Sequence, residues 1–304
     1  MSEPQRMRRG RRGGAGGGGR EKGAITQSAW RMPANPFAPF QIVSDDQIEA
    51  IHQASLRVLA EQGMEVLHEP ARALLKREGA TVEGDNVLFD PAMIEEKVAT
   101  APDHVTLHAR NPARNVTIAP GNICNAAVGG PAFTTDLDRG RRNANFEDMK
   151  NFSRLIQMLD VIHMEGGGAV EPTDLPAETR HLDMYQAFIT LTDKAWTGYA
   201  LGAFRADDGI DMAAIALGTD RAGLLERPAI LTVINSNSPR RLDGPMSEGL
   251  MAYAEAGQPF AATPFTLAGA MAPATIAGAS VQQNAEALAM ITLAQCVRPG
   301  TPVI

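Results

Sequence analysis

The chain lacks long hydrophobic runs and is poor in cysteine. Its 304 residues contain no stretch of roughly 18 consecutive apolar residues, so the sequence predicts no membrane-spanning helix. The two cysteines, Cys124 and Cys296, are too few for a disulfide framework and do not form a metal-binding cluster. Lone cysteines of this kind are typical of buried thiols in a reducing compartment, and we expect a cytoplasmic protein.

Motifs of several enzyme classes are also missing. The histidines form no H-E-x-x-H zinc motif, and the chain has neither a P-loop nor a G-x-S-x-G nucleophile elbow. His163, within DVIHMEG, lies on a predicted strand, and we interpret it as a hydrogen-bonded core residue rather than a ligand. The sequence therefore predicts no metal site, no nucleotide site and no activated covalent nucleophile.

Charge is distributed unevenly along the chain. Residues 1–31 hold eight basic and two acidic residues, a net charge of +6, which leaves −13 on residues 32–304 of a chain whose total is −7. Because an acidic body repels phosphates, we expect no nucleic-acid ligand for the folded part. The Gly/Arg-rich leader over residues 1–31 is predicted to be disordered, since its segment RMRRGRRGGAGGGGREKG has too few apolar side chains to offset the entropy cost of ordering. An RGG-like RNA-binding arm stays an alternative that deletion of residues 1–31 would test.

Residues 32–135 predict a small α+β section. After a proline-rich connector, SDDQIEAIHQASLRVLAEQ reads as an amphipathic helix with Ser44 as its N-cap, and PARALLKREG as a second helix. Short strand-like runs follow at VLFD, VTLHA, NVTIA and NICNAAV.

Residues 136–304 alternate strands with helices. The predicted strands are VIHMEGGGAV, AWTGYAL, PAILTVINSN, PFAATPF and the final TPVI, with a helical pattern between each pair. Such alternation predicts a parallel sheet, and we expect an α/β fold of the (β/α) TIM-type barrel class, incomplete at the C-terminus. An open doubly wound sheet is the alternative, although no strand is followed by the G-x-G-x-x-G turn of dinucleotide-binding folds.

Candidate ligand residues follow these strands, because ligands bind at the carboxyl ends of parallel strands. Some have structural alternatives: Asp174 could cap a helix, and Asn235 or Asn237 could serve a turn. In the segment GAMAPATIAGASVQQNAEALA, we expect Thr275 to be an N-cap at a site rim, where a substrate carboxylate could bind. The candidates are Glu171, Asp174, Tyr199, Asn235, Asn237, Phe265, Thr275 and Glu286.

Several of these segments together carry a family likeness. GGPAFTTDLDRGRRNANFEDM, the EPTDLP and NSNSP turns, and the stretch from Gly269 to Ile304 resemble the trimethylamine methyltransferase family, which includes glycine betaine methyltransferases. The resemblance spans about residues 40–304. It implies a TIM-barrel enzyme that moves a methyl group from a methylated amine to the Co(I) of a separate corrinoid protein. Family members are longer than this chain, so the resemblance implies an N-terminal part.

The resemblance also sets the expected cofactors and partners. A corrinoid-binding D-x-H-x-x-G motif is absent, so no cofactor is expected to bind directly, and the corrinoid would arrive on a cognate partner protein. The small-molecule partner would be a quaternary or tertiary methylamine, glycine betaine being the best single choice. A carboxylate and aromatic faces such as those of Tyr199, Phe204 and Phe265 would suit such a cation. A homo-oligomer, a barrel lyase or hydrolase without corrinoid, and a non-catalytic cation-binding protein remain open.

Overall fold

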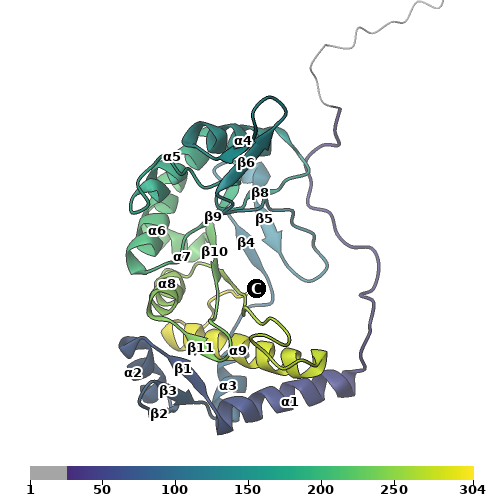
Figure 1. The fold of residues 1–304 in the computed structure, drawn as a ribbon, viewed down its shortest axis with the longest axis vertical. Coiled ribbons are helices and arrows are strands. Elements are labelled where there is room, and N and C mark those ends of the chain that lie inside the picture. The colour runs from purple at the N-terminus through teal and green to yellow at the C-terminus, as the bar shows by residue number, and fades with distance from the viewer. Residues whose placement is uncertain (1–25) are drawn as a thin grey trace, which may run out of the picture.

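The computed structural model describes residues 26–304 (Figure 1). No helix in this range is long and apolar enough to cross a membrane. The helices are α1 (Asp45–Glu61), α2 (Glu69–Arg77), α3 (Pro91–Val98), the 3-10 turn η1 (Pro112–Arg114), α4 (Phe146–Met158), α5 (Arg180–Leu191), α6 (Ala203–Leu217), α7 (Arg221–Glu226), α8 (Gly244–Glu255) and α9 (Ile276–Val297). The predicted disorder of the leader falls mainly on residues 1–25, which lie outside the described residues.

A parallel sheet forms in the second half of the chain. Its order is β12-β10-β9-β8, and every neighbouring pair is parallel. Val303 adds a parallel bridge to Phe260 beyond β12. The strands are β8 (Met164–Glu165), β9 (Ala195–Gly198), β10 (Ile230–Ile234) and β12 (Phe260–Ala262). The predicted α/β class with consecutive parallel strands is therefore confirmed, and the predicted strand-like TPVI contributes one bridge.

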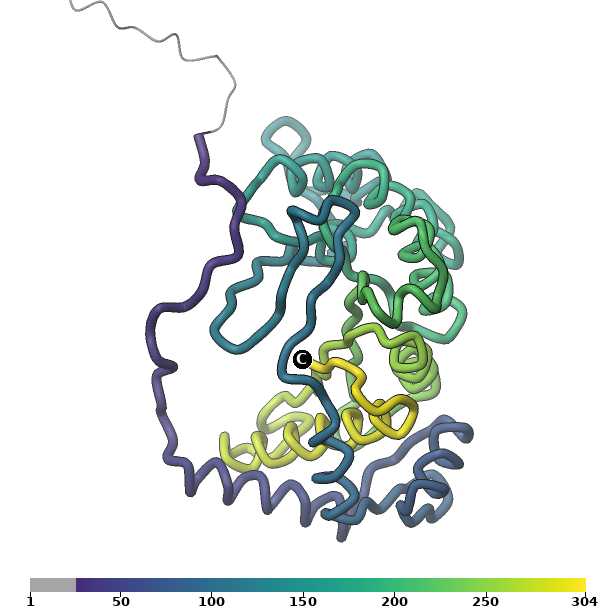
Figure 2. Tube along the Cα trace, turned by 180° about the vertical axis from the view of Figure 1, so that it is seen from behind, coloured from purple at the N-terminus to yellow at the C-terminus, as the bar shows by residue number. Residues whose placement is uncertain are grey.

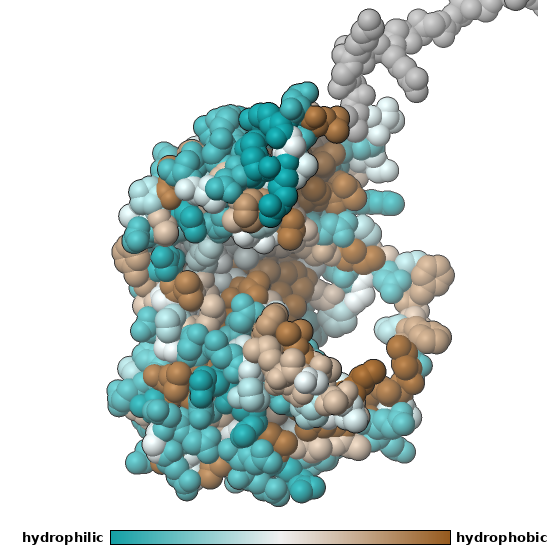
Figure 3. Space-filling view, viewed as in Figure 1, coloured by the Kyte–Doolittle hydropathy of each residue, from teal (hydrophilic) through white to brown (hydrophobic). Residues whose placement is uncertain are grey.

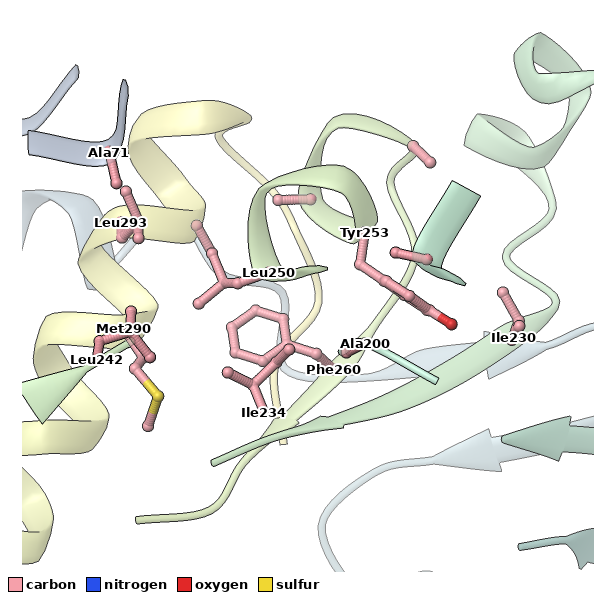
Figure 4. Packing of buried hydrophobic residues seen from close by; sticks show 14 of the residues in the cluster. Ala71, Ala200, Ile230, Ile234, Leu242, Leu250, Tyr253, Phe260, Met290 and Leu293 are labelled. Carbon is pink, nitrogen blue, oxygen red and sulfur yellow. The ribbon is translucent and has the colours of Figure 1, made fainter. Parts of the chain in front are cut away.

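Helices α5, α6 and α8 cover one face of this sheet. Successive side chains of a strand point to opposite faces, so Ile230 and Ile234 of β10 share one face. That face lies against these helices, and both side chains are fully buried. In Figure 4, Leu250 and Tyr253 extend from α8 toward the strands, and Leu250 lies against Phe260. This helix–sheet layer forms one large part of the hydrophobic core, and α9 and the N-terminal section form much of the rest.

A hairpin of β4 (Val105–Leu107) and β5 (Val116–Ile118) covers the opposite face near the amino ends of the strands. Leu107 and Val116 pack there against Met164 and Ala195. The His108 amide donates to the Pro228 carbonyl, just before β10, at 2.7 Å. Since the amino edge of the sheet is covered, the carboxyl edge is left for ligands.

The N-terminal section builds a second sheet of order β11-β1-β3-β2. It includes β11 from the second half of the chain, which pairs in parallel with β1, whereas β1–β3 and β3–β2 are antiparallel. A separate antiparallel hairpin, β6–β7, precedes α4. The bounds are β1 (Met64–Val66), β2 (Thr81–Glu83), β3 (Asn86–Leu88), β6 (Phe133–Asp136), β7 (Gly140–Asn143) and β11 (Arg241–Leu242). The predicted strand NICNAAV forms only isolated bridges at Asn122 and Ala126.

Helix α9 joins the two sections. It lies beside α1 in both views of the chain and also packs on α2, α3 and α8 (Figures 1 and 2). Its apolar residues are distributed around the whole helix rather than on one stripe, as expected for a helix buried on several sides. Both predicted N-caps are confirmed: Ser44 forms a capping box with Gln47 on α1, and the Thr275 hydroxyl accepts the Gly278 amide on α9.

The segment before α1 follows the outside of the molecule (Figure 2). His163 binds its first described part: the ring Nδ1 accepts the Asn125 amide at 2.8 Å, and Nε2 donates to the Arg31 carbonyl at 2.9 Å. The Trp30 ring packs edge-on against His163. His163 is thus a hydrogen-bonded buried residue, as predicted.

Candidate active site

A cavity of about 460 Å³ lies at the carboxyl edge of the parallel sheet. It is formed by the residues that follow β8, β9 and β10, by a glycine loop before β6, and by Met246 of α8. Figure 3 shows that the visible face is hollowed between the part carrying α4 and α5 and the part carrying α8 and α9. The lining residues are Gly129, Gly130, Gly166, Gly167, Glu171, Thr197, Gly198, Tyr199, Ala200, Leu201, Thr232, Val233, Asn235 and Met246.

Glu171 and Tyr199 meet in this cavity. Tyr199 is the first residue after β9, and its hydroxyl donates a hydrogen bond to Glu171 Oε1. Glu171 Oε2 lies 3.0 Å from Nε of Arg180, an ion pair whose alignment falls short of a hydrogen bond. One carboxylate is therefore flanked by a phenol and a guanidinium.

Tyr199 remains a neutral phenol in this setting. Burial raises its pKa well above the usual range, and the hydrogen bond to Glu171 and the negative charge there act in the same direction. A neutral phenol beside a carboxylate donates a hydrogen bond and offers the negative face of its ring to a cation. The pair can therefore attract a positively charged ligand, but Tyr199 is not suited to act as a base.

Asn235 is the third predicted residue at this cavity. It follows β10 and lines the cavity, and its Oδ1 accepts the Thr263 hydroxyl at 2.7 Å, so its NH₂ group is the part that can donate to a ligand. The structure thus brings together Glu171, Tyr199 and Asn235, each from a different strand end.

The remaining loop candidates lie away from the cavity lining. Asp174 Oδ1 accepts the Phe146 amide at 2.8 Å, so this carboxylate supports the first turn of α4, whose N-cap is Asn145, rather than the helix that follows it in sequence. Asn237 is exposed, and its amide donates to the Arg241 carbonyl within a turn. Phe265 is 56 % exposed in the loop after β12, and Thr275 caps α9.

Glu286 is fully buried but acts as an anchor between α9 and the loop after β10. Its carboxylate accepts hydrogen bonds from the hydroxyls of Ser236 and Ser238, from the Arg240 amide and from the Gln282 side chain. The Ser238–Pro239 peptide in this loop is cis. With four donors around one carboxylate, Glu286 has little capacity left for a ligand.

Glu165 was not anticipated from the sequence. It ends β8 and is fully buried; Oε2 accepts the amides of Gly167 and Gly168 at 2.7 and 2.9 Å, while Oε1 has no partner among residues 26–304. Burial raises its pKa to about 7, although the backbone hydrogen bonds act in the opposite direction. The only signal in the sequence is an acid followed by three glycines at a strand end.

The glycines of this turn are required by close packing. A Cβ on Gly166 would lie 1.6 Å from the Ala127 carbonyl oxygen, a distance that no side chain tolerates. The turn that Glu165 holds through the Gly167 and Gly168 amides thus lies against the Ala127 backbone beside the cavity. Within the described part of the chain, no three His, Cys, Asp or Glu side chains gather closely enough to hold a metal ion.

Comparison with known proteins places these features in a family. The family model for trimethylamine methyltransferase (MTTB) matches residues 8–304. Similar proteins include the glycine betaine methyltransferase of Desulfitobacterium hafniense (strain Y51), 41 % identical over 87 % of this chain and 55 % of its own length. The proline betaine:corrinoid methyltransferase of Eubacterium limosum is 29 % identical over 86 % of this chain and 55 % of its own.

A third relative is the trimethylamine methyltransferase MttB of Desulfitobacterium hafniense (strain DSM 10664 / DCB-2), 26 % identical over 86 % of this chain and 53 % of its own length. The chain thus spans about half the length of the curated relatives it matches. A family model that covers nearly the whole chain, together with a relative at 41 % identity, decides the assignment. The chain belongs to the trimethylamine methyltransferase family.

Proposed function

We propose that this chain supplies the amine-binding part of a methyltransferase that moves a methyl group from a quaternary amine to the Co(I) of a corrinoid protein. The observation that carries the proposal is the Tyr199–Glu171 pair in a cavity at the carboxyl edge of a parallel sheet. We propose glycine betaine as the substrate, since a glycine betaine methyltransferase is 41 % identical to this chain.

The proposed architecture is a TIM-type barrel over residues 136–304, preceded by an α+β section over residues 32–135. Consecutive parallel strands β8, β9, β10 and β12, each separated from the next by helix, support it, because a barrel wall has that order. The β4–β5 hairpin would close the amino end of the barrel. The cavity would then lie at the barrel mouth, where βα-barrel enzymes bind their substrates.

In this proposal the chain binds and orients the amine. The Tyr199 ring contacts the methylated nitrogen, Glu171 adds negative charge, and Asn235 contributes a polar group to the same cavity. Co(I) on the partner supplies the nucleophile, so no side chain of this chain needs to be activated as one. The leaving group is a neutral tertiary amine, so no general acid is needed. The remaining task is to exclude water and hold one methyl group in line with the acceptor.

The proposed partners follow from these separate roles, in which this chain binds the amine and a second protein carries the corrinoid. The corrinoid acts as a co-substrate carried by its own protein, and we propose that no cofactor binds this chain directly. We further propose that the enzyme is cytoplasmic, that it requires neither nucleic acid nor a membrane, and that it forms a homo-oligomer.

Isothermal titration calorimetry tests the binding half of the proposal. We expect the wild-type chain to bind glycine betaine, and Glu171→Gln to weaken binding about tenfold or more, since a charge beside the cation is lost. Glu83→Gln, at an exposed carboxylate on β2, is the matched control and should leave the dissociation constant unchanged. Absence of binding to glycine betaine and to tetramethylammonium would contradict the proposal.

Absorbance spectroscopy tests the transfer half. Incubation with a Co(I) corrinoid protein and glycine betaine should give the methyl-Co(III) spectrum when the complete catalytic unit is present. Turnover of an amine without corrinoid would instead indicate a lyase or hydrolase. Tight binding without any methyl transfer in the complete unit would indicate a cation-binding protein.

A further inference from the structure

All three tyrosines of the chain meet at the end of β9. The Tyr199 amide donates to the hydroxyl of Tyr185, on α5, at 2.8 Å. The hydroxyl of Tyr253, on α8, donates to the Tyr199 carbonyl at 3.4 Å. Tyr185 and Tyr253 are fully buried, and Figure 4 shows the Tyr253 side chain pointing from α8 toward the strands. The two peptide groups of Tyr199 are thus held from two different helices.

These contacts begin where the sheet ladder ends. The last residue pair between β9 and β10 is Gly198 with Thr232, so Tyr199 lies one residue beyond the ladder. Even at that pair, the Thr232 hydroxyl donates to the Gly198 carbonyl at 2.8 Å. Buried peptide groups without partners are costly, and side-chain hydroxyls supply those partners here. The backbone direction at Tyr199 is therefore set by side chains of α5 and α8 and not by strand pairing.

Two glycines leave the room that the hydroxyls occupy. A Cβ on Gly198 would lie 2.5 Å from the Tyr253 hydroxyl, which is closer than real contacts allow. A Cβ on Gly209, inside α6, would lie 3.3 Å from the Tyr185 hydroxyl and 3.5 Å from that of Tyr253. A Cβ at Gly209 would thus be tight against the Tyr185 hydroxyl and in ordinary contact with that of Tyr253, so the stricter requirement for glycine lies at Gly198.

We propose that Tyr185 and Tyr253 are positioning residues that fix the ring of Tyr199 against Glu171. Neither side chain lines the cavity: each hydroxyl holds a peptide group of Tyr199, and the Tyr185 ring also packs beside the Tyr199 ring, with centroids 6.1 Å apart. The Tyr185 contact is shorter and better suited to a hydrogen bond, so Tyr185 carries the larger part of the effect. The inference rests on the proposed function, because Tyr199 is the residue that contacts the amine there.

The positioning can be measured without any ligand. A chain labelled with ¹³C in its tyrosine rings should give three ring signals, which the three Tyr→Phe variants assign. In Tyr185→Phe the Tyr199 signal should move and its ring flips should become faster, with a smaller change in Tyr253→Phe. Thr292→Val is the matched control, because it removes a buried hydroxyl that has no partner in the described residues. An unmoved Tyr199 signal in both tyrosine variants would overturn the proposal.

The consequence for binding is measured by a double-mutant cycle. Tyr185→Phe should weaken glycine betaine binding roughly two- to tenfold, the worth of one hydrogen bond, while Thr292→Val has no effect. In a Tyr199→Leu background, Tyr185→Phe should cause no further loss, because the ring that it positions is gone. An equal loss in both backgrounds would show that Tyr185 does not act through Tyr199. If the wild type binds no quaternary amine, the proposed function fails, and the ring signals still decide the positioning.

Discussion

Glu165→Gln should change how stability depends on pH. The folded Glu165 carboxyl has a pKa of about 7, raised from its usual 4.5 by burial at the end of β8. Between pH 4.5 and 7, the folded state therefore holds a proton that the unfolded state has released. Stability contributed by this group is present below pH 4.5 and is lost as the pH rises through 7. The difference of roughly 2.5 between the two pKa values corresponds to about 3 kcal/mol of unfolding free energy.

The glutamine variant keeps an oxygen acceptor for the amides of Gly167 and Gly168 but does not ionise. Its NH₂ would occupy the place of Oε1, which has no partner among the described residues, and that cost is the same at every pH. The stability of the variant relative to wild type should therefore rise by about 3 kcal/mol between pH 4.5 and pH 8. The test concerns how the difference in unfolding free energy between the two proteins changes with pH, and not the size of that difference at any one pH.

Urea unfolding followed by circular dichroism, repeated at half-unit steps of pH, measures the difference directly. The exposed Glu83→Gln variant controls for the loss of one negative charge and should show a much shallower change. A constant difference between Glu165→Gln and wild type across the whole window would refute the reasoning. It would mean that Glu165 is ionised in the folded state as readily as in the unfolded chain.

Three further changes test other contacts. Lys194→Met should lower the free energy of unfolding by about 2–3 kcal/mol, because the buried ammonium donates to three carbonyls at the end of α4 and beyond it. Thermal denaturation measures this loss, with Lys76→Met, at an exposed lysine, as the control. His163→Ala should speed native-state proteolysis near Trp30 and lower the melting temperature only slightly. An unchanged cleavage rate would argue against His163 as the residue that anchors the segment around Trp30 and Arg31. Glu286→Ala should cost about 3 kcal/mol, since four donors lose their acceptor, and urea unfolding that shows a loss near zero would contradict this account.

The elements that were predictable from the sequence are those with strong periodicity or capping signals. The helix after Ser44, the helix after Thr275 and the alternation of strands and helices all occur in the structure. Local patterns specify such elements because they depend on neighbours within a few residues. The pairing of β1 with β11 was not predictable, since it joins Glu65 to Arg241 through strands of two or three residues. Nothing local marks that register.

The site could be predicted only as far as topology determines it. Glu171, Tyr199 and Asn235 were placed at strand ends, and consecutive parallel strands bring their ends together. Whether a carboxylate faces a ligand or accepts structural hydrogen bonds depends on tertiary contacts. Glu286 and Glu171 are both candidates from the sequence, but Glu286 accepts four protein donors and Glu171 lines the cavity. The positions of Glu165 and Tyr185 likewise follow from burial, which the sequence alone does not reveal.

The packing of α1 against α9 has a consequence for how the protein is made. Helix α1 leaves the ribosome long before α9, its principal neighbour, has been translated. At about 5–20 residues per second, its apolar side would wait roughly 10–40 seconds for that neighbour. During this interval the nascent chain presents Leu56 and Leu59, fully or almost fully buried in the final fold, to the surrounding solvent. A nascent chain arrested before α9 should therefore be a better chaperone substrate than one arrested after it.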